Sequence, residues 1–309
     1  MDVITEQAYK SINQGSKSFA LASRFLPKRY RDSVAMLYAW CRYCDDIIDG
    51  QEMGHGQLSN YKDGQLDRLS YLSKKTTEAL SGKFMNDPIF DGLAKVINEN
   101  DIEHKYPEQL LMGFTMDANC RVYRTIEDVL DYSYYVAGVV GIMIAKIMGV
   151  KDEAVLDRAC DLGIAFQLTN IARDVIDDAK ADRVFLPQSL FLDTAINGSA
   201  KELIDHNNLA VLHRAVLAQL SIADEYYKSS KVGIEALPFR CAWAMSAALY
   251  VYRDIGNKIK NQGPKIWSTR VSSSIIRKVY LSILALFSTF LRRGDNYAPR
   301  QMLYQRPRF

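Results

Sequence analysis

Four aspartates occur as two pairs with the same spacing, Asp45 with Asp49 and Asp174 with Asp178. On a helix, residues four apart lie on one face with their Cβ atoms about 5–6 Å apart, so each pair can present two carboxylates to one cation. Ligand sets made of oxygen alone favour Mg²⁺ or Mn²⁺ over zinc, and Mg²⁺ commonly completes its coordination shell with water and substrate phosphate. Two such pairs facing each other across a helical bundle would hold a diphosphate between them.

The second pair belongs to a segment, residues 162–178, that is apolar around most of its circumference and is therefore expected to be buried. Four polar residues form a narrow stripe on it, at spacings of three, four and four: Gln167, Asn170, Asp174 and Asp178. A buried carboxylate without a partner is costly, so the stripe needs a cation or hydrogen-bond partners. One acidic pair alone would be read as a solvated helix face. Two pairs, each preceded by an arginine (Arg42 or Arg173), favour a metal site.

The elements that must position these residues are helices. Apolar residues return every three or four positions through most of the chain, and no sustained period-two segment competes with this pattern. Breaks in this pattern, which predict helix ends, fall at Gly50 to Gly56, Asn86 to Pro88, Tyr106-Pro107, Gly149-Val150, Arg183 to Pro187, Leu237-Pro238 and Gly263-Pro264. The pattern predicts an all-α bundle of about eight to ten helices. Because no linker-like tract interrupts the middle of the sequence, we expect one domain over residues 1–309, with a basic tail from about residue 292.

Composition excludes several classes of function. The net charge of +3 is too small to indicate a nucleic-acid binder. Two cysteines, Cys41 and Cys44, have the spacing of half a zinc site, but no second pair completes it. The N-terminus, MDVITEQAYK, lacks the basic start and apolar run of a secretory signal, so we expect a cytoplasmic protein. No apolar stretch is expected to reach the roughly 20 residues that span a bilayer.

The end of the chain is basic, with nine Lys or Arg residues and one acid, Asp295, from Pro264 onward. Such an end is typical either of a segment that contacts anionic lipid or phosphate or of a solvated tail. Residues 275–293 combine apolar side chains with Arg277, Lys278, Arg292 and Arg293, which is the pattern of a helix lying on a membrane surface. An ordinary terminal core helix is the alternative. Peripheral contact with the inner face of the cell membrane is therefore an open hypothesis.

Longer motifs follow one another along the chain. The two longest are Tyr132-Ser-Tyr-Tyr-Val136-Ala137-Gly138-Val-Val-Gly141 and Leu162-Gly163-x3-Gln167-x2-Asn170-Ile-Ala-Arg173-Asp174-x3-Asp178-x4-Arg183-x-Phe185-x-Pro187. Earlier come Gly15-Ser16-Lys17-Ser18-Phe19 and Tyr38-x3-Arg42-x2-Asp45-Asp46-x2-Asp49. In type, spacing and order these motifs resemble the squalene/phytoene synthase family, and the resemblance covers nearly the whole chain.

The resemblance implies a helical bundle of the class I isoprenoid synthase type with a central active-site cavity. It implies that Mg²⁺ is ligated by Asp45, Asp49, Asn170, Asp174 and Asp178. It implies that nine residues contact the substrate diphosphate: Ser16, Lys17, Ser18, Tyr38, Arg42, Gln167, Arg173, Tyr250 and Arg270. The catalytic set would comprise the four paired aspartates, Arg183, and Tyr132, which would steer the cation or a departing proton. Candidates for the cavity wall, or alternatively for simple core packing, are Phe19, Val136, Val140 and Phe166.

The activity that the resemblance implies is a Mg²⁺-dependent prenyltransferase reaction that joins two prenyl diphosphates head to head. The segments Leu237-Pro238-Phe-Arg240-x-Ala-Trp243 and Tyr252-Arg253-Asp254-Ile-Gly256 and the end Gln305-Arg306-Pro307 are similar to the bacterial phytoene synthase branch. That branch converts two geranylgeranyl diphosphates through prephytoene diphosphate into 15-cis-phytoene, with release of diphosphate, as the first committed step of carotenoid biosynthesis. The Gly-x-Gly-x-x-Gly fingerprint of nicotinamide binding is absent, so NADPH is not expected.

Three alternatives stay open. A squalene or dehydrosqualene synthase type of enzyme would use farnesyl diphosphate and perform the same first half-reaction. A terpene cyclase would handle a single substrate and would lack these motifs. A non-catalytic scaffold member of the family would have no need to keep both acidic pairs.

Overall fold

The structure is a computed structural model that describes residues 2–51, 62–268, 271–291, 300 and 302–308. Over these residues the chain is helical and contains no β-strand, so the prediction of an all-α fold is confirmed. The α-helices are α1 (Val3–Gly15), α2 (Lys17–Ser23), α3 (Lys28–Asp49), α4 (Gln65–Leu80), α5 (Pro88–Glu99), α6 (Lys105–Ala118), α7 (Ile126–Ser133), α8 (Val139–Ile147), α9 (Glu153–Lys180), α10 (Ala200–Leu203), α11 (Leu209–Glu235), α12 (Phe239–Gln262) and α13 (Ile275–Phe290). A π-helical turn, η1 (Tyr134–Gly138), joins α7 to α8, and short 3₁₀ turns are η2 (Gln188–Phe191), η3 (His206–Asn208) and η4 (Pro264–Ser268).

Helix boundaries follow local chemistry at most of the predicted breaks. Gly50 ends α3 in the left-handed conformation at φ 58°, which glycine adopts without strain. Asp87 caps α5 by accepting a hydrogen bond from the Ile89 amide. The break predicted at Tyr106-Pro107 is wrong, because α6 begins at Lys105 and Pro107 lies in its first turn, where a missing amide hydrogen costs nothing.

The number of helices also exceeds the prediction of eight to ten, since the described residues alone contain α1 to α13. One cause is Ser16, which caps α2 and separates it from α1 within a stretch that reads as continuous. Another is the four-residue helix α10, which lies in the region between α9 and α11 and is too short to give a periodic signal.

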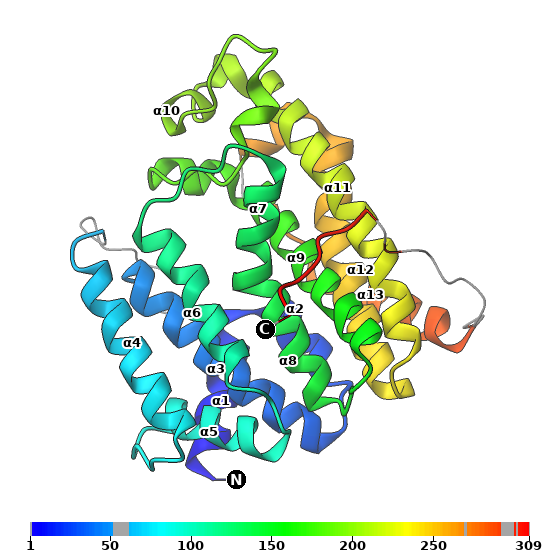
Figure 1. The fold of residues 1–309 in the computed structure, drawn as a ribbon. Coiled ribbons are helices and arrows are strands. Elements are labelled where there is room, and N and C mark those ends of the chain that lie inside the picture. The colour runs from blue at the N-terminus through cyan, green and yellow to red at the C-terminus, as the bar shows by residue number, and fades with distance from the viewer. Residues whose placement is uncertain (1, 52–61, 269–270, 292–299, 301, 309) are drawn as a thin grey trace.

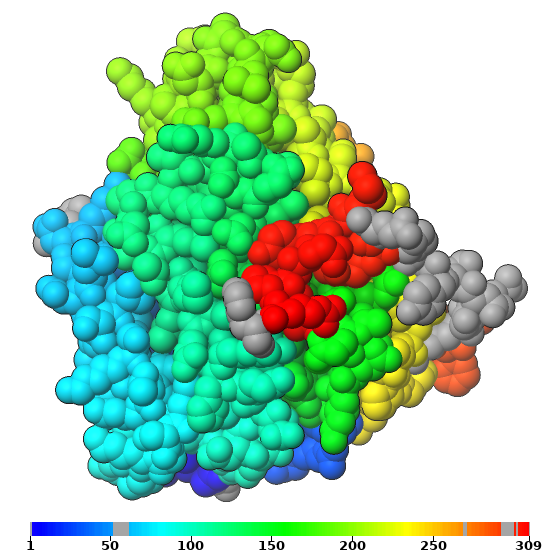
Figure 2. Space-filling view, viewed as in Figure 1, coloured from blue at the N-terminus to red at the C-terminus, as the bar shows by residue number. Residues whose placement is uncertain are grey.

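The long helix α9 lies at the centre of the bundle and carries the second acidic pair (Figure 1). It packs against α8, α11 and α12, while α3, which carries the first pair, packs against α1 and α5. Helix α13 covers the outer side of α12. Figure 2 shows the C-terminal residues, in red, lying on the outer surface of the bundle beside the green and yellow segments.

The glycines of the two long motifs let α9 touch the η1–α8 segment backbone to backbone. A Cβ added at Gly163 would lie 2.2 Å from the carbonyl oxygen of Ala137, and one added at Gly141 would lie 2.3 Å from that of Ala159. Any larger residue at either position would force the two helices apart. The motifs therefore encode the packing that holds the polar stripe of α9 in place.

One helical stretch, Ile126–Ile147, is long and apolar enough to cross a membrane by length and composition alone. The sequence analysis did not identify this stretch as long enough to span a bilayer. In the structure 61% of its apolar window is buried inside the protein, as in a core helix.

Candidate active site

A cavity of about 410 Å³ runs between α3, α8, α9, α11 and α12. The side chains proposed from the sequence as its walls, Phe19, Val136, Val140 and Phe166, all line it. Along α9 the lining extends from Val155 to Arg173, a rise of about 27 Å for a regular helix. One end is polar and the other is apolar, with Ile144, Met148, Val155 and Leu237 at the apolar end. This shape suits a long apolar molecule with a charged head.

The two acidic pairs meet beside the polar end of the cavity. Asp45 lines the cavity itself, Asp49 and Arg183 line a neighbouring pocket, and Asp174 and Asp178 line neither. Arg183, which follows α9, donates a hydrogen bond to Asp49 Oδ2 at 2.6 Å and another to Asp178 Oδ1 at 3.1 Å. One guanidinium thus lies between a carboxylate of α3 and a carboxylate of α9, so the two helices present their acids to each other.

The remaining acids of the two pairs are also held by arginines. Arg42 donates to Asp45 at 2.7 Å, and Arg173 donates through Nε to Asp174 at 2.9 Å. Both arginines line the cavity. Arginine donates two parallel hydrogen bonds to phosphate as readily as to carboxylate, so these side chains can turn to a diphosphate placed beside them.

The donor set at this end fits Mg²⁺. Among the described residues Asn170 Oδ1 is buried and accepts no hydrogen bond, while its amide nitrogen donates to Gln167 Oε1 at 3.4 Å. An unpartnered buried carbonyl oxygen near carboxylates is a ligand that a hard cation such as Mg²⁺ can use. No three His, Cys, Asp or Glu side chains in the described part of the chain lie close enough to enclose an ion. Each acidic pair alone would therefore supply only part of a coordination shell, and Mg²⁺ typically takes the rest from water and phosphate.

Burial and neighbouring acids raise the pKa values of two of these aspartates. Burial raises the pKa of Asp45 to about 6, with Asp49 adding to the rise and Arg42 opposing it. Burial likewise raises the pKa of Asp178 to about 7, with Arg183 opposing and Asp174 adding to the shift. Ionising both pairs without a cation is therefore unfavourable, and a divalent cation would relieve the repulsion.

We expect Mg²⁺ to stabilise the protein more at about pH 8 than at about pH 5.5. A raised carboxyl pKa means that the folded protein keeps a proton that the unfolded chain has already released. The stability contributed by Asp45 and Asp178 is thus complete below about pH 4 and is lost as the pH rises through about 6 and 7. Thermal unfolding with and without Mg²⁺ measures this difference. An equal Mg²⁺-induced shift at both pH values would contradict the assignment.

The predicted diphosphate residues divide into those at the cavity and those away from it. The lining includes Ser16, Tyr38, Arg42, Gln167 and Arg173. Lys17 is exposed, and neither it nor Ser18 is part of the lining. Arg270 lies outside the described residues.

Tyr250 does not line the cavity, whereas Tyr252 does and stacks on Phe166 with ring centroids 4.2 Å apart. Residues two apart on a helix point about 200° away from each other, so only one of these two tyrosines can face the cavity. Tyr252 is therefore the tyrosine of α12 that the structure brings to the site.

The approach of Tyr38 depends on a glycine. A Cβ added at Gly15 would lie 2.4 Å from the Tyr38 hydroxyl. The absence of a side chain at Gly15 thus lets the α1–α2 junction, with Ser16, close over Tyr38 at the polar end of the cavity.

Tyr132 has a partner that the sequence analysis missed. Its buried hydroxyl donates to Asp117 Oδ2 of α6 at 3.0 Å, and its ring stacks on Phe185 at 5.2 Å. Burial raises the pKa of Asp117, and the charge of Asp49 adds to the rise. A signal for Asp117 was present, because it continues the apolar stripe of Leu110 and Phe114 at helical spacing.

Sequence comparison gives consistent matches over most of the chain. Residues 12–277 match the family described as squalene/phytoene synthase. The chain is 46% identical over 275 residues to the 15-cis-phytoene synthase of Paracoccus sp., covering 88% of this chain and 87% of the relative. It is 41% identical over 305 residues to the 15-cis-phytoene synthase of Pantoea ananas, covering 98% of each chain.

Solved structures share the fold. A dehydrosqualene synthase bound to a ligand superposes with a TM-score of 0.76 at 27% identity, covering 91% of this chain and 95% of the other. A squalene synthase from Alicyclobacillus acidocaldarius superposes with a TM-score of 0.72 at 20% identity, covering 84% and 94%. The second likeness is one of fold alone.

Proposed function

Because the chain belongs to the squalene/phytoene synthase family, we propose that it is a Mg²⁺-dependent prenyltransferase that condenses two geranylgeranyl diphosphates into 15-cis-phytoene. The observation that carries the proposal is the long cavity with two acidic pairs that face each other beside its polar end. The relatives of 41% and 46% identity that are named 15-cis-phytoene synthase support this product over that of the squalene type.

The chain's own residues can bind and orient a prenyl diphosphate. Asp45, Asp49, Asn170, Asp174 and Asp178 would hold Mg²⁺, or Mn²⁺ in its place, and the ion would neutralise the leaving diphosphate as a Lewis acid. Arg42 and Arg173 line the same end of the cavity and add fixed positive charge where negative charge develops on the diphosphate.

The apolar side chains that line the cavity would bind the prenyl chain and keep water out. Phe19, Val136, Val140 and Phe166 hold the prenyl chain, and they exclude the water that would capture an allylic cation. Tyr132 lines the same cavity and its hydroxyl donates to Asp117, so its ring would be held in one orientation beside the prenyl chain. The reaction ends by proton loss, without NADPH, as in the phytoene branch.

A competition experiment tests the substrate. With Mg²⁺ and equal amounts of geranylgeranyl and farnesyl diphosphate, we expect the C40 hydrocarbon to dominate, with kcat/KM favouring the longer substrate by at least about tenfold. Mass spectrometry of the extracted hydrocarbons measures the ratio. A predominant C30 product would move the protein to the dehydrosqualene or squalene type, and a lack of condensation with either substrate would favour a scaffold.

We also propose that this is a cytoplasmic protein that contacts the inner face of the cell membrane through α13. The helix buries Leu281, Ala285 and Thr289 against the protein. Its other side exposes a row of apolar side chains: Ile275, Ile276, Val279, Tyr280, Ile283, Leu284, Phe287 and Phe290. Isolated exposed apolar residues are ordinary, but such a continuous row marks a contact surface.

Charge favours an anionic lipid surface as the partner of this helix. The sequence of α13 contains Arg277 and Lys278 and no acid. Arg277 pairs with Asp254 at 2.8 Å, but 48% of its side-chain surface remains exposed. Burial lowers the pKa of Lys278, and the nearby charges of Lys17, Lys258 and Arg173 add to the shift. Through the contact of Arg277 with Asp254, the start of α13 lies against α12 two residues from Tyr252, which lines the cavity, so an amphipathic substrate could enter there from a lipid surface.

Liposome flotation tests this contact. The wild-type chain should float with anionic vesicles, and it should float less with neutral vesicles or at high salt. The double variant Ile276→Glu/Phe287→Glu should lose flotation. Leu192→Glu, which changes an equally exposed leucine outside α13, should retain it. Equal recovery of all three proteins with both kinds of vesicle, insensitive to salt, would count against the proposal.

A further inference from the structure

A charged side chain lies at the apolar end of the cavity. Arg158 of α9 is 5% exposed and lines the cavity beside Met148, Val155 and Leu237. It precedes Asn170 by twelve residues, which places it about 18 Å along α9 from the metal end. A diphosphate held at Asn170 would direct its prenyl chain toward Arg158. The aliphatic stem of this arginine therefore forms part of the wall where that chain ends.

The guanidinium of Arg158 is anchored outside the cavity. Its Nη1 donates to the Ser229 carbonyl oxygen at 3.2 Å and to Ser229 Oγ at 3.0 Å on α11. Close packing fixes the stem as well, because a Cβ added at Gly233 would lie 2.6 Å from Arg158 Cβ. The side chain thus lies across the junction of α9 and α11.

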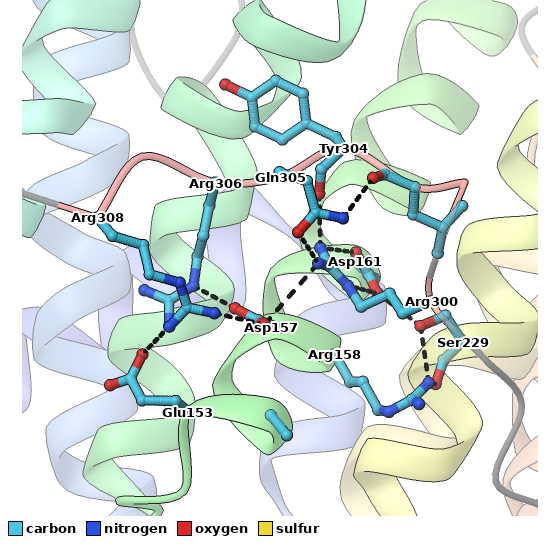
Figure 3. A network of polar contacts seen from close by, with 12 residues as sticks. Glu153, Asp157, Arg158, Asp161, Ser229, Arg300, Tyr304, Gln305, Arg306 and Arg308 are labelled. Atoms are coloured by element: carbon cyan, nitrogen blue, oxygen red, sulfur yellow. Dashed lines mark hydrogen bonds and ion pairs between the residues drawn. The ribbon is translucent and has the colours of Figure 1, made fainter.

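The anchor continues to the C-terminal end of the chain. Ser229 Oγ donates to Asp161 Oδ2 at 2.5 Å, and Asp161 accepts two further hydrogen bonds from Arg300, at 2.7 and 2.8 Å (Figure 3). We call Arg300 together with residues 302–308 the C-terminal strap. Its contacts form a chain of hydrogen bonds from the strap through Asp161 and Ser229 to Arg158 and so to the cavity wall.

The rest of the strap is held along the same helix. Arg306 and Arg308 both pair with Asp157 and Glu153, and the Tyr304 hydroxyl donates to Asp131 of α7 at 3.0 Å. Arg308 is 53% exposed, and its partners Glu153 and Asp157 do not line the cavity. The strap therefore contains one arginine linked to the cavity wall and one comparable arginine that is not.

Arg300 and Arg158 are both linked to Asp161, Arg300 directly and Arg158 through Ser229. Arg158 and Asp161 are three residues apart on α9, a spacing at which opposite charges pair readily. Asp161 has no exposed side-chain surface, so it requires a cation. While Arg300 supplies that cation, the guanidinium of Arg158 keeps its hydrogen bonds to Ser229. Without Arg300 the guanidinium of Arg158 would turn toward Asp161 and draw its stem away from the cavity.

We propose that the C-terminal strap sets the length of prenyl chain that the cavity accepts, with Arg300 as the positioning residue and Arg158 as the residue that ends the cavity. The proposal rests on the proposed function, because it requires a prenyl chain in this cavity. It adds a determinant of chain length that lies outside the metal and diphosphate residues.

Steady-state kinetics with C15, C20 and C25 prenyl diphosphates test the proposal, with thermal unfolding of each variant in parallel. Arg158→Ala should raise the ratio of kcat/KM for the C25 over the C20 substrate by at least about tenfold, since one isoprene unit gains room. Arg300→Gln should shift the ratio in the same direction. Arg308→Gln, the matched control, should leave it within about twofold of wild type.

A double variant separates positioning from general destabilisation. If Arg300 acts through Arg158, Arg300→Gln should change the ratio no further in the Arg158→Ala background. Arg158→Met keeps most of the length of the side chain and provides a milder variant if Arg158→Ala does not fold. The ratio of kcat/KM for the C25 over the C20 substrate in Arg158→Met should lie between those of wild type and Arg300→Gln. An unchanged ratio in Arg158→Met and Arg300→Gln, with C20 condensation intact, would overturn the proposal and leave the proposed function standing. Failure of the wild-type chain to condense any C20 substrate would instead reject the proposed function.

Discussion

Replacing Asp45 or Asp178 with asparagine should reduce turnover by at least about a hundredfold while the protein stays folded. Each substitution removes a charged oxygen ligand of the metal site and leaves the shape of the side chain nearly unchanged. Folding should hold, because Arg183 keeps Asp49 at 2.6 Å and Arg42 keeps Asp46 at 3.8 Å. At about pH 8 the free energy of unfolding without metal should be equal to or above that of wild type, because one crowded charge is gone.

Asp177 provides the matched control for this experiment. It precedes Asp178 on α9 but is exposed and pairs with Lys180 at 3.8 Å. Asp177→Asn should keep turnover within about twofold of wild type. Initial rates under saturating substrate and limiting Mg²⁺ give the comparison. If Asp45→Asn or Asp178→Asn retained the rate of Asp177→Asn under these conditions, the metal assignment would fail.

Removing residues 300–309 should lower the free energy of unfolding by about 3–5 kcal/mol, because Asp157 and Asp161 lose their strap arginines and Arg158 can replace only part of what Asp161 loses. Asp161 has no exposed side-chain surface and Asp157 is only 12% exposed, and both pair with strap arginines. Burial by itself raises the pKa of Asp161, and the hydrogen bond from Arg300 opposes this. Chemical denaturation of the full and shortened chains measures the loss.

Two further variants show whether charge is the cause. Arg308→Gln removes an exposed ion pair and should cost at most about 1 kcal/mol. Asp161→Asn in the shortened chain should recover part of the lost stability, since an amide needs no cation. A shortened chain with the unfolding midpoint of the full chain would show that the strap contributes no stability.

The polar stripe of α9 could be predicted from the sequence because its residues lie within one helix. Gln167, Asn170, Asp174 and Asp178 lie on one helix, and helical geometry alone places them on one side. Asp117 and Tyr252 required tertiary information, because the rotation of α6 and α12 about their axes is set by packing against other helices. The resemblance led to Tyr250 on α12, two residues from the tyrosine that faces the cavity.

The basic end of the chain shows a different limit of sequence reasoning. Its arginines were interpreted as contacts for anionic lipid or phosphate, or as a solvated tail, and residues 292–299 lie outside the described residues. Arg300, Arg306 and Arg308 instead pair with acids on α9. Their partners lie about 140 to 155 residues earlier in the chain, and periodicity carries no information about such distant pairing.

The most direct test of the central claim is product analysis after incubation with geranylgeranyl diphosphate and Mg²⁺, with and without NADPH. We predict phytoene in both reactions, in equal amounts, and no hydrocarbon when the metal is chelated. A reductive enzyme must hold a nicotinamide beside the final cation, and neither the sequence motifs nor the phytoene synthase relatives indicate one. A reduced C40 or C30 hydrocarbon that forms only with NADPH would contradict the account and place the protein with the squalene-type enzymes.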